Sequence, residues 1–241
     1  MASPAQFIKR IEIRGLWHRL DIAWDLRPDV NILSGVNGIG KTTILRRSVH
    51  YLETAGSGKA GEERDGVRIT FDPAEATTIP YDVIRSYAYS SDQAQLLDEL
   101  LQRYKACDVA ATDRHMFQEL VDRLFGHTFK TIDRHSSEIA FLQGGERLLP
   151  DKLSSGEKQM LIILLTVLLR GHAHCVLFMD EPEVSLHIEW QQKLISFVRE
   201  LNPNVQLVIS THSPALIMEG WLDAVTEVSD ISTPTHEEAA R

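Results

Sequence analysis

The sequence predicts an α/β fold in a single domain, and three observations support this class. An apolar strand at residues 30–34 leads directly into a glycine-rich loop, which a run that can form a helix follows. Two later apolar runs, residues 174–179 and 205–209, have the length of buried strands and end in polar residues. With 241 residues, 43% of them hydrophobic, the chain is long enough to bury one good-sized core.

Composition and charge argue against several classes of protein. The longest apolar run, residues 160–169, is shorter than the roughly 18 residues that cross a membrane, and the N-terminus has no signal-peptide segment. Cys107 and Cys175 are isolated and lack metal-ligand spacing, so we expect reduced thiols in a cytoplasmic protein. The net charge of −9 argues against broad affinity for nucleic acid, although it leaves room for a local basic patch.

The first strands are predicted by alternation. Residues 7–14 and 20–26 alternate apolar and polar side chains, as half-buried strands do, and Gly15 between them permits a turn. We therefore expect an antiparallel pair at the start of the chain. Residues 67–71 and 83–89 are further strand candidates, and the polar, glycine-rich residues 56–66 predict a surface loop.

The glycine-rich loop, Gly35-Val36-Asn37-Gly38-Ile39-Gly40-Lys41-Thr42, matches the Walker A pattern G-x-x-x-x-G-K-[ST] in full. Glycines let successive N–H groups point at a phosphate without Cβ clashes. Lys41 is expected to reach the β- and γ-phosphates of ATP, and the Thr42 hydroxyl to bind Mg²⁺. The predicted nucleotide-binding residues of this loop are Gly35, Asn37, Gly38, Gly40, Lys41, Thr42 and Thr43.

Two acids follow the buried run at residues 174–179, as in a Walker B motif. Asp180 at the end of such a strand can hold the Mg²⁺ ion and its water shell, and Glu181 can orient or deprotonate the attacking water. The alternative is that the two acids only mark the end of a strand. The Walker A loop earlier in the chain argues against this alternative. Two roles remain for Glu183: it belongs to this motif, or it is an acidic residue at the N-terminus of a helix, where the helix dipole favours it.

A third candidate is the stretch from Lys152 to Leu161. Ser154, Ser155 and Gly156 stand just before a long apolar run, so a hydroxyl, backbone N–H groups and a helix dipole meet at one point that suits a phosphate. By itself the stretch is equally consistent with the N-cap of a buried helix.

The sequence Leu153-Ser154-Ser155-Gly156-Glu157-Lys158-Gln159 resembles the signature motif of ABC-type ATPases related to the SMC, RecF and OLD families. The run Glu181-Pro182-Glu183-Val184-Ser185-Leu186-His187 resembles the Walker B and D-loop region of the same families. The resemblance implies that Ser154, Ser155 and Gly156 close over the ATP held by a second protomer. It also implies that His212, after the strand at 205–209, contacts the γ-phosphate.

Two assignments from the resemblance stay open. Gln93, with Gln95 next, is the candidate for the glutamine that touches the metal in these ATPases, but the surrounding residues also fit the capped start of a helix. Trp17 is a candidate for the aromatic residue that stacks on adenine.

We expect an ABC-ATPase-like P-loop NTPase whose mixed sheet carries an inserted helical lobe. The core lobe is expected at residues 1–91 and 171–228, the helical lobe at 92–170 and a disordered tail at 229–241. Within the lobe, helices are expected across 92–125, split near 107–113, followed by a hairpin of 128–132 with 138–142. A helix is expected at 188–201 and a last strand at 221–228.

The predicted function is hydrolysis of Mg-ATP by a head-to-tail homodimer or heterodimer. About 110 residues separate Lys41 from Ser154 without a sustained heptad repeat, so the long coiled-coil arms of SMC proteins are excluded. The motif variants resemble ATPases of bacterial anti-phage defence operons, which implies control of a partner effector or nuclease. The alternatives are the nucleotide-binding subunit of a membrane transporter and a RecF-like DNA-repair ATPase, whose activity DNA would stimulate.

Overall fold

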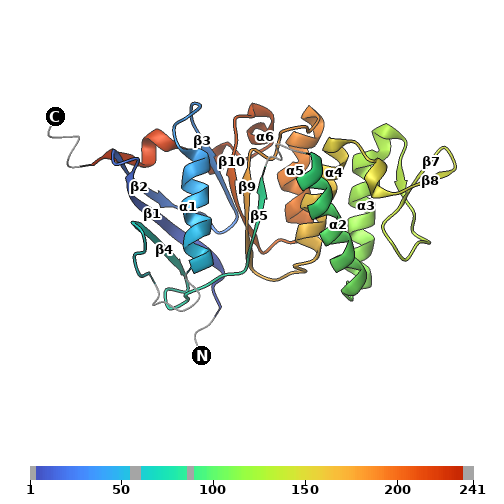
Figure 1. Cartoon of the computed structure of the whole chain (residues 1–241), viewed down its shortest axis with the longest axis horizontal. Helices are drawn as coiled ribbons and strands as arrows, with labels where there is room; N and C mark the ends of the chain where they lie inside the picture. The colour runs from blue at the N-terminus through green and yellow to red at the C-terminus, as the bar shows by residue number, and fades with distance from the viewer. Residues whose placement is uncertain (1–3, 55–60, 86–89, 236–241) are drawn as a thin grey trace. The chain divides into compact units, whose positions relative to one another are not determined.

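A computed structural model gives the fold and describes residues 4–54, 61–85 and 90–235 (Figure 1). The chain forms two compact units. The first comprises the described parts of Met1–Arg85, His174–Pro182 and Asn204–Arg241. The second comprises those of Ser86–Ala173 and Glu183–Pro203.

The first unit combines strands with one long helix. Its strands are β1 (Phe7–Leu16), β2 (Leu20–Asp25), β3 (Val30–Ser34), β4 (Val67–Asp72), β5 (Tyr81–Arg85), β9 (Cys175–Asp180), β10 (Val205–Ser210), β11 (Val225–Glu227) and β12 (Ser232–Pro234). Its helices are α1 (Lys41–Thr54), the short α6 (Pro214–Met218) and the 3-10 turns η3 (Leu222–Ala224) and η4 (Val228–Ile231).

A parallel sheet positions the catalytic motifs. Its strands run in the order β11-β3-β10-β9-β5, and every neighbouring pair is parallel. Ser210 of β10 pairs with Asp180 of β9 on one side and with Leu33 of β3 on the other. The carboxyl ends of these three strands therefore share one edge of the sheet, which is where α/β folds bind their ligands.

An antiparallel sheet, β12-β2-β1-β4, accompanies the parallel one in the first unit. The predicted pairing of the first two strands is confirmed, with Ile13 opposite Ile22. Helix α1 contributes Ile44, Leu45 and Val49 to a core that also contains side chains of both sheets. Each strand of the pair turns its alternate apolar residues into that core, which is why the sequence alternates.

The buried side-chain amide of Gln206 joins the two sheets through hydrogen bonds to backbone groups. Its Oε1 accepts a hydrogen bond from the Ile8 N–H at 2.8 Å, and its Nε2 donates to the carbonyls of Ile8 and Arg27, each at 2.8 Å. Satisfying both ends of the amide is what allows a glutamine inside an otherwise apolar strand.

The second unit is mainly helical. Its helices are α2 (Ser90–Ala106), α3 (Ala111–Phe125), α4 (Ser155–Leu168), α5 (Ile188–Leu201) and the 3-10 turns η1 (Gly126–Thr128) and η2 (Pro150–Lys152). Helix α4 contacts α2, α3 and α5, and the four lie side by side in Figure 1. From Met160 to Leu168 every residue of α4 is buried, as expected for a helix that is apolar on all sides.

A small antiparallel sheet completes the second unit with β6 (Thr131–Ile132), β7 (Phe141–Gln143) and β8 (Glu146–Leu148). The predicted hairpin is confirmed in its pairing, since Thr131 lies opposite Leu142. Its first strand is shorter than expected because residues up to Thr128 form η1. The third strand was not predicted, and Gly144 and Gly145, both with positive φ, form the turn that leads into it.

Three expected boundaries are wrong. Residues 229–234 are not a loose tail, because η4 and β12 continue the fold and Ser232 pairs with Ile22 of β2. The expected last strand at 221–228 is divided between η3 and the three-residue β11. The expected strand at 83–89 begins earlier, at Tyr81, and its residues 86–89 lie outside the described residues.

The grouping of elements also differs from the expected lobes. The sequence assigned residues 171–228 to the core lobe, whereas Glu183–Pro203, which includes α5, belongs to the second unit. The reason is packing, because α5 buries Trp190 and Leu194 on its apolar face, and that face contacts α3 and α4.

Candidate functional site

The Walker A loop connects β3 to α1 and depends on its glycines. Gly35, Gly38 and Gly40 have φ angles of 140°, 79° and 111°, in the region that side chains with a Cβ rarely adopt. Lys41 is only 5% exposed, and its Nζ donates to the carbonyls of Gly35 at 2.8 Å and Val36 at 3.2 Å. The ammonium group thus lies over the loop that the sequence assigns to the phosphates.

Trp17 packs on this loop from the turn between β1 and β2. A Cβ at Gly40 would lie 2.8 Å from Cη2 of Trp17 and 3.2 Å from Cδ2 of Leu16. Glycine is therefore required at position 40 both for its φ angle and for the close approach of the indole. Trp17 lines the pocket beside the loop with its side chain half exposed, and its stacking on adenine stays a prediction.

Asp180 and Thr42 meet at the end of β9. The Asp180 Oδ1 accepts a hydrogen bond from Thr42 Oγ1 at 2.9 Å and another from Ser210 Oγ. A hydroxyl and a carboxylate, both hard oxygen donors, fit Mg²⁺, which prefers one or two protein oxygens together with phosphate and water. Ser210 was not predicted, although a polar residue ending a buried strand next to the Walker B strand is the signal for it.

The side chains of Glu181 and His212 are in contact beside these oxygens. His212 Nε2 lies 3.3 Å from Oε1 of Glu181. Glu181 has a φ of 49°, which is unfavourable for a residue with a side chain, and its N–H donates to the Ser210 carbonyl at 2.9 Å. The backbone bond to β10 holds this strained conformation and directs the carboxylate toward the histidine.

These groups line one pocket of about 510 Å³ within the first unit. Its lining consists of Trp17, Asn37, Gly38, Gly40, Lys41, Thr42, Thr43, Glu181 and His212. Gly35 lies behind the pocket as the acceptor for Lys41, and Asp180 as the acceptor for Thr42. The structure therefore brings together the residues that the sequence assigned to the Walker A loop, to the Walker B motif and to the γ-phosphate contact.

The signature stretch lies in the second unit, where it begins α4. Ser154 is the N-cap, and its hydroxyl accepts from the Glu157 N–H at 3.3 Å while Glu157 Oε2 accepts from the Ser154 N–H at 2.8 Å. This reciprocal pair is a capping box. Both interpretations of the stretch thus share the same residues, because a capped helix N-terminus is also a site that suits phosphate.

Gly156 allows the D-loop region to approach the signature. A Cβ at Gly156 would lie 2.5 Å from the Ser185 carbonyl oxygen, closer than any real side chain tolerates. Ser185 itself has a φ of 72°. The glycine is therefore needed for a contact between two backbone segments, which neither segment's own sequence reveals.

Glu157 connects the signature helix to the segment that follows α3. Its Oε1 accepts hydrogen bonds from Thr128 Oγ1 and from Lys130 Nζ, each at 2.9 Å. Burial by itself raises the pKa of the Glu157 carboxyl, but the hydrogen bonds from Lys130, the Ser154 backbone and Thr128 outweigh it and lower the pKa overall. Glu157 therefore remains a buried carboxylate.

Gln93 lies within the first turn of α2, in agreement with the helical alternative. Its Nε2 donates to the Ser155 carbonyl at 3.1 Å and to Oε1 of Gln159 at 3.2 Å, and the side chain is buried. A contact between Gln93 and a nucleotide-bound metal would require both hydrogen bonds to break. In this structure Gln93 supports the start of the signature helix.

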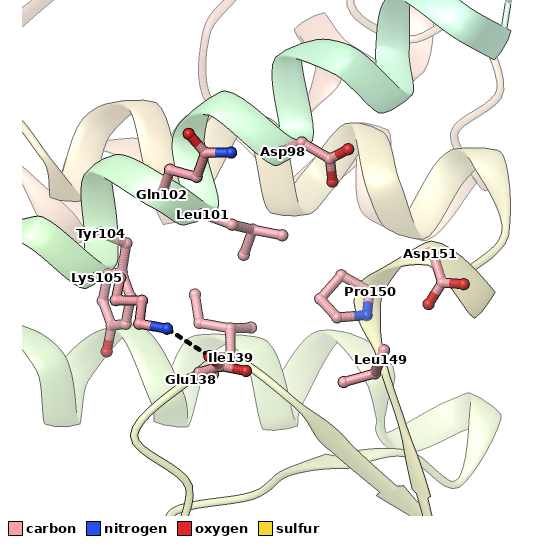
Figure 2. A pocket seen from close by; sticks show the side chains of 10 residues that line it. All are labelled: Asp98, Leu101, Gln102, Tyr104, Lys105, Glu138, Ile139, Leu149, Pro150 and Asp151. Carbon is pink, nitrogen blue, oxygen red and sulfur yellow. Dashed lines mark hydrogen bonds and ion pairs between the residues drawn. The ribbon is translucent and has the colours of Figure 1, made fainter.

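The second unit contains a further pocket, of about 370 Å³, between α2 and the residues that precede β7 and α4 (Figure 2). Leu101, Ile139 and Pro150 form its apolar surface, and Lys105 pairs with Glu138 at 2.7 Å on its edge. The pair raises the pKa of Lys105 and lowers the pKa of Glu138. Its lining lacks a glycine loop, and we assign it no part in nucleotide chemistry.

No helix in the described ranges is long and apolar enough to cross a membrane.

Comparison with known proteins identifies the family. Residues 61–219 match the sequence family described as "AAA domain, putative AbiEii toxin, Type IV TA system". The chain is 29% identical over 194 residues to a "Putative ABC transporter ATP-binding protein" from Archaeoglobus fulgidus, a match that covers 80% of this chain and 60% of that protein. It is 28% identical over 93 residues to a "Retron Vc95 probable ATPase" from Vibrio cholerae, covering 38% of this chain and 18% of that protein.

The fold is similar to that of a solved SMC head domain. The SMC head domain from Thermotoga maritima superposes with a TM-score of 0.57 at 15% identity, covering 95% of this chain and 98% of that one. The chain spans less than two thirds of the length of both curated relatives. Because the family match covers well over half of the sequence, the chain belongs to the AAA family of that description, and its fold is that of a P-loop NTPase.

Proposed function

We propose that the pocket of the first unit binds ATP with Mg²⁺ and hydrolyses it, and that two copies of the chain hold two ATP molecules head to tail. The observation that carries this proposal is the meeting of Lys41, Thr42, Glu181 and His212 in one pocket whose loop can adopt a phosphate-binding conformation only with glycine. Membership of an ATPase family supports the same chemistry.

The loop residues bind the phosphates in this proposal. The N–H groups around Gly38 and Gly40 point at the phosphate oxygens, and Lys41 Nζ exchanges its two carbonyl partners for the β- and γ-phosphates. Asn37 and Thr43 line the same pocket, and the indole of Trp17 offers a face on which adenine can stack. Thr42 and Asp180 hold Mg²⁺, which neutralises charge on the phosphates.

Glu181 is the general base for hydrolysis. It takes a proton from a water molecule as the water oxygen attacks the γ-phosphorus, and the bond to the oxygen that bridges the β- and γ-phosphorus breaks to give ADP and phosphate. His212, 3.3 Å from Glu181, orients that carboxylate and donates a hydrogen bond to a γ-phosphate oxygen. This contact links detection of the γ-phosphate to the position of the base.

The signature supplies the other side of the site. Ser154, Ser155 and Gly156 present a hydroxyl and the N-terminus of α4, which favours an anion. We assign them to the ATP bound by a second copy, or by a closely related chain, so that ATP holds the dimer together. Gln93 fixes the Ser155 carbonyl and keeps this helix start in position.

The dimer is proposed to regulate a partner effector in bacterial anti-phage defence, in the cytoplasm where ATP is available. Two observations support this role. The family description names a toxin of a toxin–antitoxin system, and one relative is named as a retron ATPase. These names describe the other proteins, so the effector role needs a test on this chain. Co-purification from the native host is the direct test. Recovery with an integral membrane protein would contradict the effector role.

The name of the Archaeoglobus relative favours a second candidate, the ATP-binding subunit of a membrane transporter. In that case the chain would co-sediment with membranes and its ATPase rate would respond to a transported solute. An ATPase rate that is the same with and without membranes would argue for the effector role.

The catalytic assignment is tested by phosphate release and calorimetry on two variants. Lys41→Ala removes the cation of the pocket and is expected to abolish ATP binding. Glu181→Gln keeps binding but should lower turnover by about two orders of magnitude or more, because the base is lost. Leu222→Ala, a substitution of an exposed residue outside the pocket, is the control. Wild-type turnover by either active-site variant would refute the assignment.

A further inference from the structure

Phe129 combines two features that each lower the stability of a folded chain. Its side chain is 83% exposed, so the phenyl ring gains little from burial. Its backbone has a φ of 56° and a ψ of 30°, in the left-handed region where glycine or asparagine is favoured over bulky residues. The left-handed backbone is that of a helix C-cap, with the Lys130 N–H donating to the Phe125 carbonyl at 3.2 Å, but burial does not account for a phenyl ring at this position.

The conformation of Phe129 is fixed by its neighbours. Its own N–H donates to the Gly126 carbonyl at 3.0 Å, and the Thr128 carbonyl accepts from Gln143 Nε2 at 2.8 Å. The two flanking side chains, Thr128 and Lys130, both donate to Oε1 of Glu157. The segment is thus held rigid while the ring between the two anchored side chains points into solvent.

Glu157 also connects this segment to the signature serine. Its second oxygen accepts from the Ser154 N–H at 2.8 Å, so one carboxylate binds both Ser154 and the residues on either side of Phe129. The segment with Phe129 and the signature serine are therefore tied to one carboxylate, and both Phe129 and Ser154 are exposed.

We propose that Phe129 is an interface residue that packs against a second copy of this chain when the signature of one copy meets the ATP of the other. The inference rests on the proposed function, because the signature surface is what the second copy covers. An aromatic side chain on a fixed backbone has only two χ angles to immobilise on contact and removes a large apolar area from water, which is typical of residues that dominate interfaces.

The test compares stability with dimer formation. Phe129→Gly relieves the left-handed strain, so the free protein should melt at the same or a higher temperature and bind ATP with unchanged affinity. In the Glu181→Gln background, however, the Kd of the ATP-dependent dimer should rise by about tenfold or more by sedimentation velocity. Phe129→Tyr keeps an aromatic ring and should keep the dimer.

Leu222→Ala is the matched control, because Leu222 is 68% exposed but precedes β11, toward the end of the parallel sheet opposite the Walker A loop. It should leave the dimer Kd unchanged. If Glu181→Gln dimerises with ATP and Phe129→Gly changes the Kd by less than about twofold, the inference is wrong and the proposed function stands. If Glu181→Gln binds ATP but stays monomeric, the inference is wrong, and so is the homodimer of the proposed function.

A photoreactive phenylalanine analogue at position 129 gives an independent test of the contact. This test takes the place of the Kd comparison if Phe129→Gly does not fold. Cross-linking of two copies only in the presence of Mg-ATP supports the inference. Cross-links that are confined to one copy, or that form equally without ATP, overturn it.

Discussion

At the scale of single residues, Glu157 is a carboxylate in an interior that ordinarily excludes charge. It is 2% exposed, yet its oxygens accept from the Ser154 N–H, the Thr128 hydroxyl and the Lys130 ammonium. A buried charge is tolerable only when it is paired and hydrogen-bonded, and removing one partner leaves the other unsatisfied. One side chain thereby fixes the signature cap and the Phe129 segment together.

Replacing Glu157 by glutamine tests this role through pH. The variant leaves Lys130 without its carboxylate and should lower the free energy of unfolding by about 1–3 kcal/mol at neutral pH. The folded-state pKa of Glu157 is below its unfolded value of about 4.3, so the carboxylate stabilises the fold fully above that value. This stabilisation is lost as pH falls through the lower folded-state pKa.

Urea unfolding of the wild type and Glu157→Gln over a pH series measures the effect. The difference in the free energy of unfolding between the two proteins should be largest near neutral pH and should disappear in acid. Glu138→Gln, which removes an exposed ion pair, should show a much smaller difference. A difference for Glu157→Gln that is independent of pH would mean that its charge contributes nothing.

At the scale of elements, the start of α4 depends on a contact between segments far apart in the sequence. Gly156 is in the first turn of that helix, and the Ser185 carbonyl lies where its Cβ would be. Ser185 belongs to the turn before α5, so the signature and the D-loop region are packed backbone to backbone. Any side chain at position 156 must push these two elements apart.

Gly156→Ala is therefore expected to be destabilising by about 1–3 kcal/mol and to impair turnover, because the overlap is with backbone that cannot rotate away. Gly126→Ala is the control. Gly126 has a helical φ of −55°, and nothing lies within 4 Å of its virtual Cβ, so alanine there should be neutral or slightly stabilising. Thermal unfolding and phosphate release are measured on both variants. Equal melting temperatures and equal rates for the two would contradict the proposed packing.

Local signals account for the elements that the sequence predicts well. Glycine spacing at positions 35–40 and the apolar runs before Asp180 and His212 predict the loop, the two strands and their shared edge, because these features act within a few residues. The short strands β8 and β12 carry too few residues for a period to appear. They exist because the chain returns to β7 and β2, which is tertiary information.

The same distinction applies to the candidate site. Motifs predict Lys41, Asp180 and Glu181, since each belongs to a contiguous pattern. The buried position of Gln93 and the anchoring of Phe129 depend on Ser155, Gln159 and Glu157, which lie far along the chain. Sequence patterns therefore identify the reacting groups better than the groups that position them.

At the scale of the whole molecule, the two units carry different parts of the proposed site. The first unit holds the pocket with Lys41, Glu181 and His212, and the second holds the signature serine and Phe129. In the proposed dimer each copy contributes its pocket to one ATP and its signature to the other. ATP binding and association are then linked, so each should strengthen the other by the same factor.

Light scattering on Glu181→Gln, with and without Mg-ATP, tests the shared site most directly. The variant should bind ATP without consuming it, so its mass should be that of one chain without nucleotide and two chains with it. Adding Lys41→Ala to this variant should keep it monomeric under both conditions. A Glu181→Gln protein that binds ATP and remains a single chain at concentrations well above its ATP Kd would contradict the homodimer account.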